Sequence, residues 1–103
     1  KVLPTLAMGG QGVISVMANI IPKDTHELCA RFMAGNLEGA RAIQLKVLDL
    51  VKALFIEASP SPIKEAMNML GMQVGDCRLP IVPMEAHNKA ILVEALKQYG
   101  LMK

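Results

Sequence analysis

The sequence predicts a mostly α-helical chain with at most one short strand, and this lone strand indicates one end of a larger α/β barrel. A glycine-rich turn, Gly9–Gly12, leads into a short β-branched run that stops at small and polar residues, which is typical of a buried parallel strand. After Asn19 the apolar residues follow helical spacing. A single central strand is unstable alone because its backbone needs partners on both sides, so we expect its neighbours outside these residues.

The first elements follow from local signals. Residues 1–8 are expected to end a short helix, which a glycine pair terminates, and the strand is predicted at Gly12–Val16. A helix then begins with Asp24 as N-cap and Glu27 three residues later, the spacing of a capping box. Its apolar face comprises Leu28, Cys29, Phe32 and Met33. Gly35 ends this helix.

A long helix is predicted next, from about Leu37 to Phe55, with Asn36 as its N-cap. Its apolar residues recur three or four positions apart: Ala40, Ile43, Val47, Leu50, Val51 and Leu54. Leu45 and Leu48 interrupt the polar side, so we expect this helix to be covered on more than one flank.

Two more helices complete the prediction. Ser61 as N-cap and Pro62 at the first helical position start the first of them. An irregular segment with two prolines follows, and the last helix is predicted over residues 84–99. Within it Glu85 and Lys89 have the i,i+4 spacing of a stabilising ion pair. The short connections indicate neighbouring helices packed roughly antiparallel.

Composition excludes several classes of protein. Hydrophobic residues make up 52% of the chain and charged residues 19%, which supplies a core and argues against disorder. The net charge of +2 includes no basic cluster, so we expect no nucleic-acid partner. No apolar stretch approaches the roughly 20 residues of a membrane-spanning helix. Cys29 and Cys77 form no CxxC motif or disulfide framework, and we expect a reducing, cytoplasmic location. Lys1-Val2-Leu3-Pro4 lacks an initiator Met and a signal pattern, and we expect it to be a cut end.

No catalytic or metal-binding constellation is evident. Gly10-Gln11-Gly12 precedes the predicted strand, whereas a dinucleotide fingerprint follows one. His26 and His87 have no partner at metal-ligand spacing, so no metal site is expected. No lysine lies in an evident desolvated pocket, which a Schiff-base lysine requires. Pro60-Ser61-Pro62 is interpreted as a helix start rather than a polyproline ligand.

Three stretches carry a resemblance: residues 9–19 (GGQGVISVMAN), 61–64 (SPIK) and 78–83 (RLPIVP). In this order and spacing the chain closely resembles the C-terminal third of the dihydrodipicolinate synthase (4-hydroxy-tetrahydrodipicolinate synthase) family. The resemblance implies a parent (β/α)8 TIM barrel with a helical C-terminal domain. Residues 1–35 would be the end of the barrel, with its last strand and last helix, and residues 36–103 the C-terminal domain.

The resemblance also implies chemistry. The family holds pyruvate as a Schiff base on a lysine and condenses it with aspartate semialdehyde, in the diaminopimelate route to lysine, without a cofactor. That lysine and its proton relay belong to earlier strands, so this fragment is expected to be inactive. One pocket contact carries over, the backbone carbonyl of Ile14, which lines the pyruvate site. The parent is expected to be a cytoplasmic homotetramer, with Met8 near a subunit contact.

Two alternatives remain at this point. A standalone helical interaction module would use Gly12–Val16 within its own core, whereas an orphaned barrel strand would be disordered, refolded as helix or loop, or paired with another chain. Another pyruvate aldolase of the N-acetylneuraminate lyase superfamily would share the barrel, because the residues that recognise the aldehyde lie outside this chain.

Overall fold

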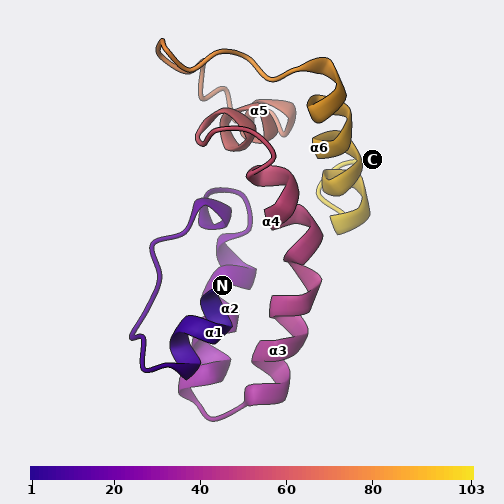
Figure 1. The fold of residues 1–103 in the computed structure, drawn as a ribbon. Coiled ribbons are helices and arrows are strands. Elements are labelled where there is room, and N and C mark those ends of the chain that lie inside the picture. The colour runs from indigo at the N-terminus through magenta and orange to yellow at the C-terminus, as the bar shows by residue number, and fades with distance from the viewer. The chain divides into compact units, whose positions relative to one another are not determined.

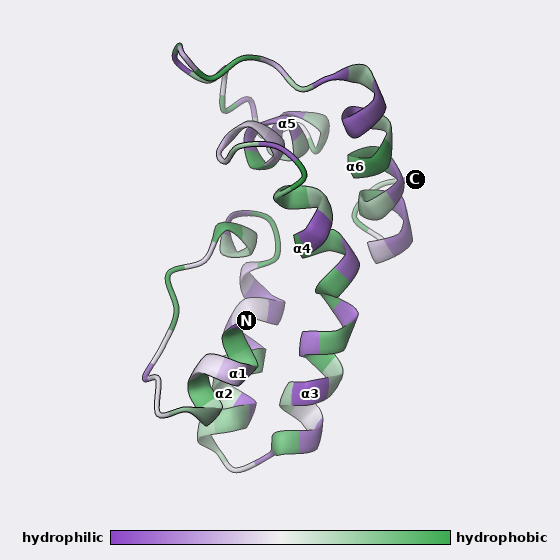
Figure 2. Cartoon of the chain, viewed as in Figure 1, coloured by the Kyte–Doolittle hydropathy of each residue, from purple (hydrophilic) through white to green (hydrophobic).

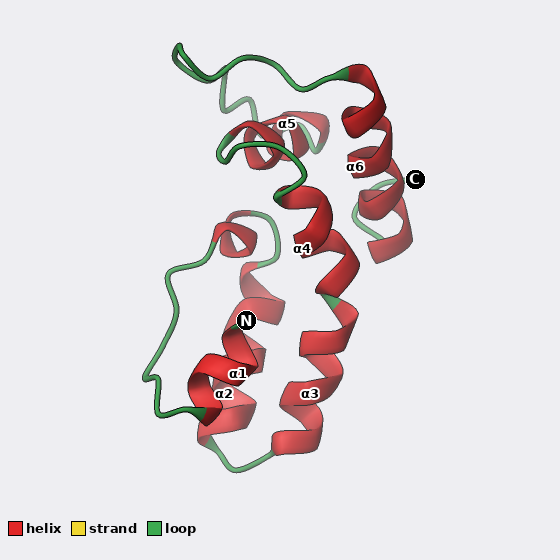
Figure 3. Ribbon diagram, in the orientation of Figure 1, coloured by secondary structure: helices red, strands yellow, loops and turns green.

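Six α-helices and one 3-10 helix make up the protein in the computed structural model, which describes residues 1–103 (Figure 1). The elements are α1 (Val2–Ala7), η1 (Val16–Asn19), α2 (Pro22–Met33), α3 (Leu37–Lys46), α4 (Leu48–Leu54), α5 (Ser61–Met69) and α6 (Ala86–Tyr99). Figure 3 shows helices and loops without a strand, which confirms the mostly helical fold class with at most one short strand. The chain divides into two compact units, Lys1–Leu48 and Asp49–Lys103.

The first unit is built around α2, which packs against α1, η1 and α3. Its buried apolar side chains are Leu6, Met17, Ile20, Ile21, Leu28, Ala40, Ile43 and Val47. The predicted N-cap at Asp24 is wrong, because α2 begins two residues earlier at Pro22, whose fixed φ suits the first helical position. Asp24 therefore lies in the first turn, where its negative charge still favours the helix N-terminus. Gly35 follows α2 with φ +83°, as expected of a glycine that ends a helix.

The long helix predicted over residues 37–55 is interrupted. Asn36 is its N-cap, as predicted, and its side-chain Oδ1 accepts a hydrogen bond from Gly39 N at 2.9 Å. The helix stops at Val47, which separates α3 from α4, and no glycine or proline at this place explains the break. Leu45 and Leu48, expected to be covered, are exposed.

In the second unit α5 packs against α6. The buried apolar side chains of the second unit are Leu50, Ala53, Leu54, Ile63, Ala66, Met84, Leu92 and Leu96. The last helix starts at Ala86 rather than Met84, because Glu85 adopts extended backbone angles. It ends at Gly100, which has the left-handed conformation with φ +94°. The expected pair of Glu85 and Lys89 is not formed, because the Lys89 ammonium instead pairs with Glu65 on α5.

Ser61 is not an N-cap. Pro60 occupies the N-cap position of α5, and Ser61 is already its first helical residue. The Ser61 hydroxyl instead donates a hydrogen bond to the backbone oxygen of Val82 at 3.2 Å. The side chain is thus used to hold a segment that lies 21 residues further along the chain.

Candidate functional site

The predicted strand at Gly12–Val16 is not formed. Residues 11–15, which we call the linking segment, belong to no helix or strand, and Val16 begins η1. A strand is stabilised by hydrogen bonds to its neighbours, and this chain supplies none. Residues 12–16 therefore have the sequence pattern of a buried strand, but the chain does not supply the neighbouring strands that such a strand needs.

Both ends of the linking segment are anchored. On its N-terminal side Gly9 has φ +96°, and Gly10 N donates to the backbone oxygen of Thr5 at 2.9 Å. A Cβ atom added at Gly10 would lie 2.7 Å from that oxygen, so the close turn requires a glycine. On its C-terminal side Ser15 O accepts a hydrogen bond from Ala18 N at 3.2 Å. The segment is therefore held at its ends by α1 and η1.

Between these anchors the backbone is unpaired. The backbone N–H and C=O groups of residues 11–14 make no hydrogen bond within the chain. Ser15 has φ −129° and ψ 135°, which are the angles of a strand. The side chain of Ile14 is fully exposed and that of Val13 is 41% exposed. Figure 2 colours the middle of this loop as hydrophobic. The segment thus presents apolar side chains and free backbone groups together.

The exposed, unpaired backbone of residues 11–14 is relevant to two expectations: the pyruvate contact of the Ile14 carbonyl and the alternative of a standalone helical module. The carbonyl of Ile14 is an acceptor without a partner, so it is available to a ligand or to a neighbouring strand. A standalone helical module was expected to bury residues 12–16 in its own core, whereas Val13 and Ile14 are exposed. Residues 11–15 form a loop, which is one of the states expected of a barrel strand without its neighbours.

The other candidate residues are not brought together. His26 and His87 are both exposed and belong to different units, and Cys29 and Cys77 are free. The structure contains no group of three or more His, Cys, Asp or Glu side chains that could hold a metal ion. No helix is both long and apolar enough to cross a membrane.

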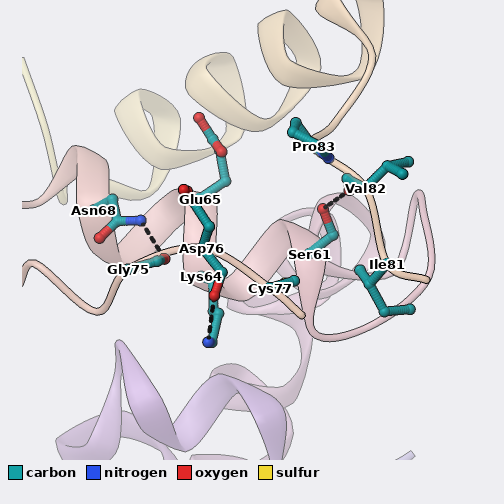
Figure 4. A pocket seen from close by; sticks show the side chains of 10 residues that line it. All are labelled: Ser61, Lys64, Glu65, Asn68, Gly75, Asp76, Cys77, Ile81, Val82 and Pro83. Atoms are coloured by element: carbon teal, nitrogen blue, oxygen red, sulfur yellow. Dashed lines mark hydrogen bonds between the residues drawn. The ribbon is translucent and has the colours of Figure 1, made fainter. Parts of the chain in front are cut away.

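A small pocket lies between α5 and the segment that follows it (Figure 4). Ser61, Lys64 and Asn68 are spaced along one face of α5, and each donates a hydrogen bond to a backbone oxygen of residues 75–82. The Lys64 ammonium donates to Asp76 O at 3.0 Å. The pocket has a volume of about 40 Å³, enough for little more than one water molecule. These side chains therefore fix the loop rather than bind a substrate. The polar i, i+3, i+7 spacing on α5 was the sequence signal for this contact.

Comparisons with known proteins identify the family. The sequence model of the Dihydrodipicolinate synthetase family matches residues 1–99. The chain is 62% identical over 101 residues to the 4-hydroxy-tetrahydrodipicolinate synthase of Acetivibrio thermocellus, which covers 98% of this chain and 35% of that protein. The chain thus spans about a third of the length of the curated relatives it matches.

Solved structures agree with this result. The crystal structure of dihydrodipicolinate synthase from Thermotoga maritima aligns with a TM-score of 0.94 at 42% identity, covering 98% of this chain and 34% of that one. The chloride-inhibited enzyme from Acinetobacter baumannii in complex with pyruvate aligns with a TM-score of 0.90 at 34% identity, covering 97% of this chain and 34% of that one. Nearly the whole of this chain therefore has a counterpart in about a third of each of these enzymes, and the chain belongs to the dihydrodipicolinate synthetase family.

Proposed function

We propose that this chain is the C-terminal part of a pyruvate-dependent Schiff-base lyase, a 4-hydroxy-tetrahydrodipicolinate synthase. The whole protein condenses pyruvate with aspartate semialdehyde in the diaminopimelate route to lysine. The observation that carries the proposal is the 62% identity over 101 residues to a protein of that name. The assembled enzyme is a cytoplasmic homotetramer, and the 89% exposure of Met8 supports its place near a subunit contact.

Residues 1–35 close the barrel of the whole protein, and residues 36–103 form its helical C-terminal domain. The unpaired backbone of residues 11–14 supports this division, because an inner barrel strand requires partners on both edges. The compact units observed divide the chain after Leu48 instead, because α3 packs against α2. In the barrel these residues extend into a strand whose C-terminal end faces the active site.

The Ile14 backbone carbonyl is the one group of this chain that we place in the pyruvate site. It has no hydrogen-bond partner in the chain, and a main-chain acceptor at the end of a barrel strand can act without a special side chain. The pyruvate-bound relative from Acinetobacter baumannii, which matches 97% of this chain, supports pyruvate as the ligand. The reactive amine comes from a lysine on another strand. It forms an imine with pyruvate, the derived enamine attacks the aldehyde, and the product closes to a ring.

The test joins this chain to the preceding two thirds of the Acetivibrio thermocellus relative, which is 62% identical in the region replaced. The chimera should condense pyruvate with aspartate semialdehyde in a spectrophotometric assay, and borohydride should trap its pyruvate imine. The 103-residue chain alone should show neither signal. A folded chimera that traps pyruvate but accepts only another aldehyde would favour a different aldolase of the superfamily. A folded chimera without imine would overturn the proposal.

The role of the Ile14 carbonyl needs a backbone change. Replacing Ser15 by the matching α-hydroxy acid converts the amide carbonyl of Ile14 to an ester, which is a weaker acceptor. Loss of about 1.4 kcal/mol of hydrogen bonding would raise the KM for pyruvate roughly tenfold. Ile14→Val is the matched control, because it keeps the backbone carbonyl, and its KM should stay unchanged. An equal effect of both changes would assign the role to the side chain.

A further inference from the structure

We propose that Asn19 is a positioning residue for pyruvate binding, because its side chain closes the turn that holds the Ile14 carbonyl at the end of the barrel strand. This inference rests on the proposed function and deepens it by naming a second residue of this chain on which the pyruvate site depends. Asn19 does not itself contact pyruvate. It acts through the backbone of residues 14–16.

The 3-10 helix η1 is closed by hydrogen bonds to two successive backbone carbonyls. Ser15 O accepts a hydrogen bond from Ala18 N at 3.2 Å. Val16 O accepts one from the side-chain Nδ2 of Asn19 at 3.0 Å. The other three residues of η1 have no strong hydrogen-bond donor in their side chains. Asn19 is therefore the residue through which a side chain stabilises this turn.

The turn is anchored in the core of the first unit. Met17 of η1 and the following Ile20 and Ile21 are 3–5% exposed, and η1 packs against α2. The buried hydroxyl of Thr25 on α2 donates to Ile21 O at 2.8 Å. The hydrogen bonds of η1 and of Thr25 lie within residues 15–25, so none of them occupies the backbone of residues 12–14. Those groups therefore stay available for pairing with neighbouring strands in the whole barrel.

Only Ser15 separates Ile14 from η1. Its φ of −129° and ψ of 135° carry the backbone directly from the predicted strand into the turn. A shift or rotation of η1 at this junction would therefore displace the Ile14 carbonyl. Groups that bind a substrate must be held within about 0.5 Å of the productive geometry. The side chain that closes the turn thus helps to fix the carbonyl that we place in the pyruvate site.

Asparagine is a residue type that suits this role. Val16 O is an acceptor, so its partner must donate, and the Asn19 amide supplies two N–H donors. An ionised aspartate of the same shape has only acceptor oxygens, so it would face the Val16 carbonyl without a donor. Because Asn19 is exposed, its replacement leaves the buried core of the first unit intact.

The test uses the chimera with the preceding two thirds of the Acetivibrio thermocellus relative. Asn19→Asp and Asn19→Ala should each raise the KM for pyruvate about three- to tenfold, the effect expected from loss of one hydrogen bond. The kcat and the KM for aspartate semialdehyde should stay within twofold. Asn36→Asp is the matched control, because the Asn36 side chain accepts its hydrogen bond through Oδ1, which aspartate retains. This variant should keep the KM for pyruvate.

A second measurement determines whether Asn19 acts through Ile14. The chimera with an ester in place of the Ile14 amide already has a weakened carbonyl. In that background Asn19→Ala should raise the KM for pyruvate less than twofold further, because two changes that act on one contact are not additive. A further three- to tenfold rise would show independent effects and would overturn the proposal.

The other outcomes are equally distinct. An unchanged KM for pyruvate in both Asn19 variants of a folded, active chimera would overturn this proposal and leave the proposed function standing. Equal rises in both KM values with a lower thermal unfolding temperature would overturn it too, because they indicate a structural role alone. An unmodified chimera that traps no imine would refute the proposed function and this role with it. If Asn19→Asp does not fold, Asn19→Ala decides the question.

Discussion

Glu57 caps α6 from a distant part of the second unit, and this contact gives a sharp prediction. The Glu57 side-chain Oε2 accepts hydrogen bonds from Glu85 N and from Asn88 Nδ2, each at 3.0 Å. Glu85 occupies the N-cap position of α6, but its own side chain makes no capping bond. Glu57 therefore satisfies a donor at the start of the helix and places a negative charge near its N-terminus, where such a charge is favourable.

The expected cost of Glu57→Ala follows from this geometry. A hydrogen bond to a charged group contributes about 1.5–3 kcal/mol when buried. The bond to Glu85 N is exposed and the bond to Asn88 only partly buried, so solvent weakens both. We expect a total loss of about 1–2 kcal/mol in the free energy of unfolding of the second unit, similar to the loss of an N-cap. Glu57→Gln keeps an acceptor and should cost less.

The assay is urea unfolding followed by the fluorescence of Tyr99, the one tyrosine in a chain without tryptophan, which lies in the second unit. Glu85→Ala is the matched control, because it removes the same charge close by and leaves the backbone donor in place. A double-mutant cycle with Asn88→Ala should give a positive coupling energy. If Glu57→Ala and Glu85→Ala unfold at the same urea concentration, the long-range cap has no energetic role.

Three further predictions concern single side chains. Leu28→Ala should lower the free energy of unfolding, measured in urea, by about 2–5 kcal/mol, because Leu28 is fully buried in the first unit. A smaller loss would mean that the core is loosely packed. Asn36→Ala should lower the free energy of unfolding by about 1 kcal/mol, because it removes the N-cap of α3. Asn36→Asp keeps a capping oxygen and should retain most of this stability, so equal losses in the two variants would argue against capping. Asn68→Ala should speed the amide exchange of Val74, which donates to the Asn68 side chain at 2.8 Å; unchanged exchange would contradict this role.

Helices and their local caps could be predicted because their signals lie within a few residues of each other. The Asn36 cap and the glycines that end α2 and α6 are examples, since each depends on the adjacent turn alone. The starts of α5 and α6 could not be predicted in the same way. Ser61 bonds Val82, and Glu57 bonds Glu85, so in both cases the polar partner lies more than 20 residues away in the sequence.

The linking segment, residues 11–15, shows a different limit of prediction from sequence. Its β-branched residues predict a strand from local preference alone, and that prediction is wrong for this chain, because a strand forms only when neighbouring strands supply hydrogen bonds. The candidate site residue, Ile14, came from the family resemblance. A backbone carbonyl carries no side-chain signature, so composition and spacing could not have identified it. The exposed and unpaired state of residues 11–14 is the structural observation that now draws attention to this position.

Amide hydrogen exchange at Val13, Ile14 and Val16 tests most directly whether this stretch is a barrel strand separated from its neighbours. The measurement compares the dilute, monomeric 103-residue chain with the chimera that carries the preceding two thirds of the Acetivibrio thermocellus relative. The three amides should exchange rapidly in the chain alone and become strongly protected in the chimera. Strong protection in the monomeric chain, or rapid exchange in a folded chimera, would contradict this account.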